Sequence, residues 1–108
     1  MEIVKTLDVA HPPRKPDQVE HQLEEALSQV HRSSSLRILK IIHGQSGTTK
    51  QVVRNWAYNK RHRLRGIIYG ENYSIFDKLT QEMRDEEGQF SDSDLDASNG
   101  GIVILWVK

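Results

Sequence analysis

The chain has 108 residues, with 15 Lys and Arg side chains, 15 Asp and Glu side chains and no cysteine. This length predicts one domain, residues 1–108, and the absence of cysteine excludes disulfides and thiolate metal sites and favours the cytoplasm. No apolar run approaches the ~20 residues of a membrane helix, and with a formal net charge of +0, binding to nucleic acid would require unevenly placed charge.

The first part of the chain predicts a strand, a helix and a second strand. A short apolar stretch ends before a pair of prolines, which favour extended geometry, so we expect a strand over residues 2–9. An acidic capping pair then precedes apolar residues with helical spacing, which predicts a helix over residues 17–30. The nearly continuous apolar run of residues 36–42 is typical of a central strand that is covered on both faces.

A loop with two glycines follows this strand and leads into a helix predicted over residues 49–60. Gly44 and Gly47 allow positive φ and close approach of a ligand. Thr48 or Thr49 can cap the helix, whose free N–H groups would then face the loop. Such a loop suits an anion such as phosphate, although many strand-to-helix turns carry glycine without binding anything.

The C-terminal part predicts two more strands with a polar insertion between them. A third strand is expected over residues 64–69, and apolar side chains between residues 73 and 83 can line a short helix. Residues 85–96 are acidic and rich in Ser, which indicates a mobile surface loop within an insertion at about 71–98. The last strand is expected over residues 102–107. The order β-α-β-α-β predicts an α/β fold with parallel first strands and right-handed crossovers.

Several of these features form a recognisable set. Leu7 and Asp8, with a His nearby, end the first strand, I-I-H-G ends the second, Val53 and Trp56 lie on the next helix, and Gly-Gly precedes the last strand. In this order they resemble the Smr domain, the small MutS-related family, over nearly the whole chain except residues 71–98. The resemblance implies a two-layer α/β sandwich, a four-stranded mixed sheet with two main helices. It also implies nucleic-acid binding, with endonuclease activity as in many members.

Two motifs depart from the family pattern. The first strand usually ends in L-D-x-H followed by glycine, whereas this chain reads L-D-V-A-H followed by proline. Residues three apart in a strand lie on opposite faces, so Asp8 and His11 converge only if a bulge or loop at Ala10 resets the alternation. The second motif is usually H-G-x-G or T-G-x-G, and here Gly44 matches while the second glycine is delayed to Gly47.

Cleavage of a phosphodiester needs a base, an acid, and positive charge or N–H donors at the phosphate. We expect the catalytic group to be Asp8, His11 and His43, with the two imidazoles sharing one phosphate. Asp8 would orient an imidazole or act as the base; the alternative is a structural carboxylate that binds loop N–H groups. The residues expected to bind phosphate are Gly44, Gln45, Ser46, Gly47, Thr48, Lys50, Arg54, Arg14 and Lys15.

Further basic and aromatic residues belong to the same hypothesis. Arg61, Arg63 and Arg65 would extend a phosphate-tracking patch if they converge with the loop, although a charge run is usually a solvated helix face. Tyr69 and Tyr73 are candidates for stacking on a base. Both tryptophans are expected in the core.

No spacing of His, Asp or Glu matches a known metal-ligand set, so we expect no tightly bound metal, with dependence on Mg²⁺ left open. RNA can be cut without a metal because its 2′-hydroxyl is an internal nucleophile. The leading hypothesis is a cytoplasmic endonuclease that acts on RNA or structured DNA with little sequence preference, alone or as part of a larger protein. The alternative is a non-catalytic module that binds nucleic acid or a protein. The acidic residues 85–96 would then be a passive insertion or a competitor of the nucleic acid.

Overall fold

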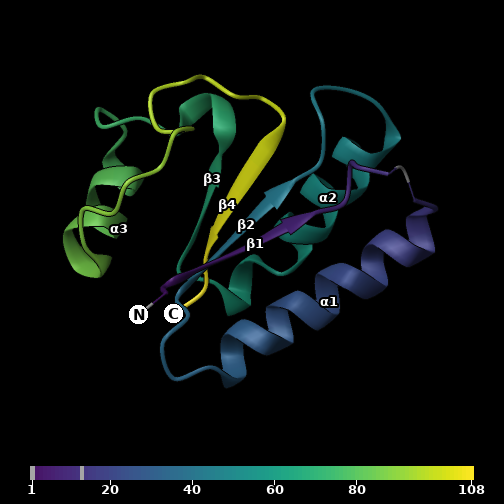
Figure 1. Cartoon of the computed structure of the whole chain (residues 1–108), viewed down its shortest axis with the longest axis horizontal. Coiled ribbons are helices and arrows are strands. Elements are labelled where there is room, and N and C mark those ends of the chain that lie inside the picture. Colours follow the sequence, from purple (N-terminus) through teal and green to yellow (C-terminus); the bar gives the residue numbers. More distant parts are fainter. Residues whose placement is uncertain (1, 13) are drawn as a thin grey trace.

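A four-stranded mixed sheet forms the centre of the protein in a computed structural model that describes residues 2–12 and 14–108 (Figure 1). The strands are β1 Val4–Asp8, β2 Ile38–Ile42, β3 Gly66–Tyr69 and β4 Ile102–Trp106, in the order β1-β2-β4-β3. β1 is parallel to β2, while β4 is antiparallel to both of its neighbours. The first three strands therefore share one direction, and the mixed α/β sheet expected from the sequence is confirmed.

Helices cover both faces of this sheet. The helices are α1 Pro16–Arg32, α2 Thr48–Asn59 and α3 Lys78–Glu87, with short 3₁₀ turns η1 Arg61–Arg63 and η2 Gly70–Asn72. Figure 1 shows α1 and α2 on one side of the sheet and α3 on the other. The bounds of the strands and of the two main helices differ from the predicted ones by at most two residues. None of the described helices is both long and apolar enough to cross a lipid bilayer.

The larger core lies between the sheet and the two main helices. Val19, Leu23 and Val30 are buried at helical spacing along α1, and Trp56 of α2 is 7% exposed in the same cluster. Every residue of β4 is buried because this strand is central and covered on both faces. The expectation that both tryptophans are core residues is confirmed, since Trp106 is 3% exposed in the smaller core on the α3 face.

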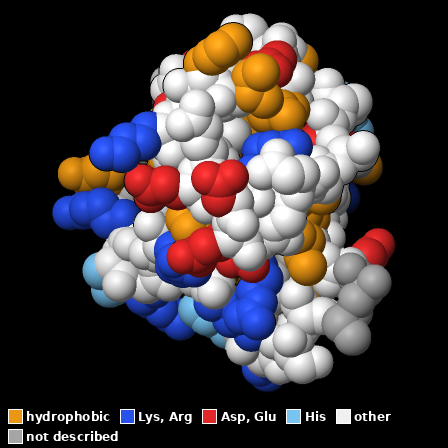
Figure 2. Space-filling model, turned by 90° about the vertical axis from the view of Figure 1, so that its left-hand side faces the viewer, with side chains coloured by type: hydrophobic (Ala, Val, Ile, Leu, Met, Phe, Trp, Pro, Cys, Tyr) orange, Lys and Arg blue, Asp and Glu red, His pale blue; other side chains and the backbone are white. Residues whose placement is uncertain are grey.

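On the α3 face, the structure of residues 85–96 differs from the mobile surface loop that the sequence predicted. The last turn of α3 runs to Glu87, and Phe90 and Leu95 then pack against the sheet core. Figure 2 shows acidic side chains gathered on this side of the molecule with Lys and Arg beside them. Phe76, expected to line the short helix, lies before α3 and is 85% exposed. Mobility of the segment in solution stays a prediction.

A partly buried cation accounts for part of this packing. Lys40 of β2 is 11% exposed, and its Nζ lies 2.7 Å from Asp92 Oδ1 and 2.5 Å from Asp94 Oδ2. The Tyr73 hydroxyl donates to Asp92 Oδ2 at 3.0 Å. Tyr73 is 1% exposed, so the expectation that it stacks on a base is wrong.

Candidate functional site

The candidate site lies where β1 and β2 end. Asp8 is the last residue of β1, and its Oδ1 accepts hydrogen bonds from the Ala10 N–H at 2.8 Å and the His11 N–H at 3.1 Å. Its Oδ2 lies 3.2 Å from His11 Nδ1. Along a strand, side chains alternate between the two faces, and this turn interrupts the alternation. It therefore brings together two side chains that a continuous strand would have placed on opposite faces.

Both members of this pair are accessible to a ligand. The side chain of Asp8 is 38% exposed and that of His11 is 77% exposed. Burial alone would raise the pKa of Asp8, but the hydrogen bonds from Ala10 and His11 outweigh it and hold this pKa below its ordinary value. An ionised carboxylate can only accept, so a neutral His11 that bonds to Asp8 carries its proton on Nδ1 and has Nε2 as its acceptor. Asp8 therefore binds loop N–H groups and orients an imidazole at the same time.

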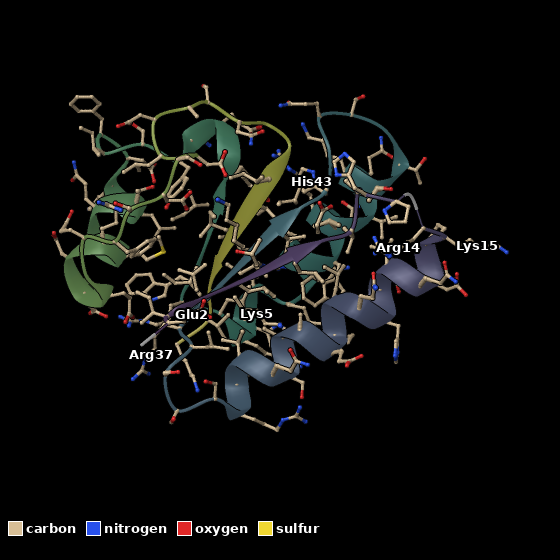
Figure 3. All side chains as sticks on the ribbon, in the orientation of Figure 1. Glu2, Lys5, Arg14, Lys15, Arg37 and His43 are labelled. Carbon is tan, nitrogen blue, oxygen red and sulfur yellow. The ribbon has the colours of Figure 1, made fainter. Side chains whose placement is uncertain are left out.

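His43 lies at the same end of the sheet but inside the protein. It follows β2 directly and is 1% exposed, and Figure 3 shows it at the end that also carries Arg14 and Lys15. Its Nδ1 lies 2.8 Å from the Gly44 carbonyl, and its Nε2 accepts from Arg54 Nε at 3.2 Å. The ring is therefore the neutral Nδ1–H tautomer with both nitrogens occupied.

This environment changes the role expected for His43. Burial lowers the pKa of its imidazole, and the charges of Arg54 and Lys50 lower it further, against an opposing effect of the hydrogen bond to Gly44. A buried, neutral imidazole with no free nitrogen is not placed to move a proton. The structure thus gives His11 the exposed position and does not offer the second catalytic imidazole that the sequence predicted.

Arg54 connects the glycine loop to the rest of this edge. Its guanidinium donates to His43 Nε2, to both carboxylate oxygens of Glu71 at 2.9 and 2.7 Å, and to the carbonyls of Gly100 and Ile102 at 3.2 Å each. It also lies over the Tyr69 ring, 4.7 Å from its centroid. Because these groups engage all of its nitrogens, the structure does not present Arg54 to a phosphate.

Glu71 is the residue that sequence reasoning missed. The bidentate hydrogen bonds from Arg54 lower its pKa to about 2. Glu71 follows the third strand as one exposed acidic residue among many, and it lies 17 positions from Arg54. No local pattern in the sequence marks it.

The glycine loop has the backbone geometry that the sequence predicted. Gly44 has φ of +93° and Gly47 has φ of +97°, both in the region that favours glycine. Gly47 is the N-cap of α2, so the expectation that Thr48 or Thr49 caps this helix is wrong. No side chain of the described residues caps its first turn, and its N–H groups and dipole remain available to an anion.

The loop rests on the turn that precedes β4. The N–H groups of His43 and Gly44 both donate to the Gly101 carbonyl, at 2.9 and 3.0 Å. The Gln45 amide donates to Asn99 Oδ1 at 3.0 Å, and Lys50 Nζ donates to the Gln45 carbonyl at 3.2 Å. Gln45 and Lys50 therefore support the loop, while Ser46, Gly47 and Thr48 are exposed at its tip.

Arg14 links the Asp8 turn to the start of α2. Its Nη1 donates to the carbonyls of Asp8 at 3.3 Å and Pro12 at 3.0 Å. Arg14 also lines a cavity of about 270 Å³ where the first turns of α1 and α2 meet, together with Thr48 and Thr49. Lys15, the N-cap of α1, is exposed next to it.

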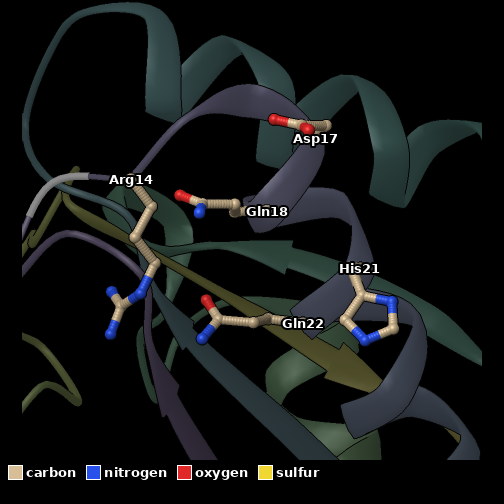
Figure 4. Close-up of a pocket in the computed structure, with 5 residues that line it drawn as sticks. All are labelled: Arg14, Asp17, Gln18, His21 and Gln22. Atoms are coloured by element: carbon tan, nitrogen blue, oxygen red, sulfur yellow. The ribbon is translucent and has the colours of Figure 1, made fainter.

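A larger cavity of about 420 Å³ lies on the other side of Arg14, along α1. Figure 4 shows its lining residues, Arg14, Asp17, Gln18, His21 and Gln22. The side chains are one guanidinium, one carboxylate, two amides and one imidazole, and they do not converge on a single point in this view. We assign this cavity no ligand.

The remaining basic residues do not converge with the loop. Arg65 pairs with Glu86 and lies over the Trp106 ring, 3.9 Å from its centroid. Arg61 and Arg63 belong to η1, beyond the C-terminal end of α2. The single patch considered from the sequence is therefore divided between two ends of the molecule.

Comparison with known proteins assigns neither a family nor a function to the chain. No protein-family model, no curated protein and no solved structure matches the chain. Within the described ranges, no group of three or more His, Asp or Glu side chains is arranged to hold a metal ion. The site is thus interpreted from its own geometry.

Proposed function

We propose that this chain is a nucleic-acid-binding domain of the Smr type and an endonuclease that cleaves RNA or structured DNA with little sequence preference. The observation that carries this proposal is the exposed Asp8–His11 pair, with Oδ2 and Nδ1 3.2 Å apart. Such a carboxylate–imidazole pair is a general base oriented by a second group. The motifs that resemble the Smr family support the same reading.

His11 would carry the proton transfer. Its free Nε2 takes the proton of the attacking hydroxyl or water while the new P–O bond forms, and the bond from phosphorus to the departing oxygen breaks. The departing oxygen then receives its proton from the imidazolium or from solvent. Asp8 stabilises the imidazolium through the Nδ1–H hydrogen bond.

The uncapped start of α2 and Arg14 would hold the phosphate. Backbone N–H groups at Thr48 and Thr49 and the positive end of the helix dipole attract an anion, and they bind it without reading a base. Arg14 supplies a full positive charge at the same cavity. This arrangement favours backbone recognition, which explains why we propose little sequence preference.

A second candidate is a binding module without catalysis. The observation that favours it is the burial of His43, which leaves His11 as the one exposed imidazole beside the loop within the described residues. A site with a single proton-transfer group would bind the backbone and cleave slowly or not at all. The ligand would be the same nucleic acid, or an acidic protein.

The test measures binding and cleavage separately. The purified protein is incubated with labelled single-stranded RNA, duplex DNA and branched DNA, with and without Mg²⁺. We expect His11→Ala to reduce cleavage by about 100-fold or more, and Asp8→Asn to reduce it while keeping an oxygen for the Ala10 and His11 N–H groups. Binding should change little in either variant.

The matched control is His21→Ala, because this exposed histidine of α1 forms an ion pair, within the described residues, only with Glu25, at 3.7 Å. It should cleave like the wild type. Salt-sensitive binding with no cleavage above the His11→Ala background would support the binding module instead. Absence of binding to all three nucleic acids at low salt would contradict both candidates.

A further inference from the structure

A second cluster of basic residues lies at the end of the molecule opposite the glycine loop. The 12 residues of α2 separate the two ends by roughly 18 Å, at ~1.5 Å per residue. Arg61 and Arg63 of η1 are exposed there, next to the C-terminal end of α1. We call the set Arg32, Arg61, Arg63 and Lys108 the basic end.

Two members of this set, Lys108 and Arg63, lie close to His31 at the end of α1. Lys108 Nζ donates to the His31 carbonyl at 3.0 Å and also to the Ser33 carbonyl. Burial lowers the pKa of His31, and the positive charges of Arg63 and Lys108 lower it further. Residues from η1, α1 and the C-terminus therefore form one surface.

No carboxylate of the described residues forms an ion pair with this surface, although the positive charge of Arg63 helps to lower the pKa of Glu24. Glu24 of α1 is already engaged, because it accepts from Lys60 Nζ at 2.7 Å and from Trp56 Nε1 at 2.8 Å. Across residues 2–12 and 14–108, none of the four residues of the basic end forms an ion pair with a carboxylate. Arg54 and Arg65, by contrast, are both paired with glutamates.

An exposed aromatic ring borders the same surface. Tyr58 of α2 is 53% exposed, and the Arg61 guanidinium lies over its ring at 3.9 Å from the centroid. Arg61 Nη1 also donates to the Tyr58 carbonyl at 2.8 Å, which holds the stacked pair in place. Flat aromatic and guanidinium surfaces next to unpaired positive charge are the elements that bind unstacked bases.

We infer that the basic end is a second nucleic-acid-binding surface, specific for single strands. Its arginines contact phosphates, and the Tyr58–Arg61 pair stacks on a base. A duplex keeps its bases stacked and so cannot use the aromatic pair. A lipid bilayer is disfavoured as the ligand because binding to it requires several exposed apolar side chains on one surface. Besides Tyr58, the exposed large apolar side chains of the described residues are Ile75 and Phe76, and these lie just before α3. The inference shares only its ligand class with the proposed function and does not require cleavage.

The test uses fluorescence anisotropy of a labelled oligouridylate and of an RNA duplex at several salt concentrations. Arg63→Glu should weaken oligouridylate binding at low salt by about fivefold or more and reduce the slope of log K against log salt by about 1. Its matched control is Lys78→Glu, the same charge change at an exposed position of α3. This control should change binding by less than about twofold.

Tyr58→Ala separates stacking from charge. It should weaken oligouridylate binding by about fivefold or more and leave duplex binding unchanged. The control is Phe76→Ala, which removes the other strongly exposed aromatic ring. Circular dichroism of each variant checks that the fold is retained.

The outcomes distinguish this inference from the proposed function. Loss of cleavage in His11→Ala supports the proposed function alone. Weaker oligouridylate binding in Arg63→Glu and in Tyr58→Ala supports the inference, whether or not the protein cleaves. Equal weakening by Arg63→Glu and Lys78→Glu would overturn it, because only net charge would then matter. It is also overturned if Arg63→Glu abolishes binding to phosphatidylserine vesicles or acidic peptides and leaves RNA binding unchanged.

Discussion

Arg54 shows how one side chain can be diverted from a ligand to the scaffold. A basic residue on the helix after a glycine loop is well placed for phosphate, but here five hydrogen bonds hold the guanidinium inside the protein. His43 keeps it in place by accepting from Nε, and Glu71 completes the arrangement from beyond β3. At this edge Arg54 therefore positions the loop and the turn that precedes β4.

This arrangement predicts a pH dependence of stability. The folded-state pKa of Glu71 is about 2, below its ordinary value of 4.5, so the unfolded chain binds this proton first as the pH falls. The stabilisation is present above pH 4.5 and is lost between pH 4.5 and 2. Because the side chain is 45% exposed, we expect Glu71→Gln to lower the free energy of unfolding by less than about 1 kcal/mol at neutral pH.

Urea denaturation at neutral and at acidic pH measures this effect. The wild type should lose more stability than Glu71→Gln as the pH falls through the window of Glu71. Glu82→Gln is the control, since Glu82 is exposed on α3 and forms no ion pair with a described residue. Identical pH profiles for the wild type and Glu71→Gln would contradict the proposed role of the Arg54–Glu71 pair.

Among the elements, the segment after α3 is tied to β2 by a buried polar network. Lys40, Asp92, Asp94 and Tyr73 supply it, and Asn99 Nδ2 adds a hydrogen bond to Asp94 at 3.0 Å. Two carboxylates are thereby bound to a partly buried ammonium group on the α3 face. Competition of the acidic segment with nucleic acid stays a prediction, but these two carboxylates are already engaged by Lys40.

Removing the cation should destabilise the protein because both carboxylates would lose their counter-charge. We expect Lys40→Met to lower the free energy of unfolding by about 3 kcal/mol, measured by chemical denaturation. Adding Asp92→Asn and Asp94→Asn should recover much of this loss, because the uncompensated charges are then gone. In Lys40→Met, the Asp96 amide, which donates to the Tyr73 carbonyl at 2.9 Å, should exchange faster with solvent.

Lys5→Met is the matched control for this experiment. Lys5 lies on the neighbouring strand β1 and forms no ion pair with any residue that the structure describes. Its substitution should change stability by less than about 0.5 kcal/mol. A similar loss in both variants would show that the network at Lys40 contributes nothing specific.

For the whole molecule, the sheet is the common wall of two cores. Trp56 belongs to the core under α1 and α2, and Trp106 belongs to the core under α3. Alternate residues of β4, such as Val103 and Ile104, face one core or the other. Loss of either core therefore exposes one face of the same strands, and the two halves should unfold together.

The two tryptophans allow a direct measurement of this cooperativity. In Trp56→Phe the remaining fluorescence reports the α3 face, and in Trp106→Phe it reports the α1 and α2 face. In each variant we expect the fluorescence midpoint in urea to coincide with the midpoint from far-ultraviolet circular dichroism. A separate, earlier fluorescence transition for Trp106 alone would show that the α3 face unfolds independently.

The sequence by itself determined the elements, their order and much of their burial. Apolar periodicity places α1 and α2, the continuous apolar run identifies β2 as a covered strand, and Gly44 and Gly47 mark the loop. These features are local, because hydrophobic period and backbone freedom are encoded in neighbouring residues. The pairing of Asp8 with His11 depends on a turn at Ala10. The sequence is compatible with this turn but does not determine it.

Only the tertiary structure decided which charged and polar side chains face a ligand. Arg54 and Glu71 are 17 positions apart, and Lys40 and Asp92 are 52 positions apart, so no local pattern links them. His43 follows the end of β2, where a catalytic residue was expected, yet the packing of β4 and α2 against it leaves it buried. A buried polar group must find partners wherever the fold provides them, and those partners are set by packing rather than by neighbouring sequence.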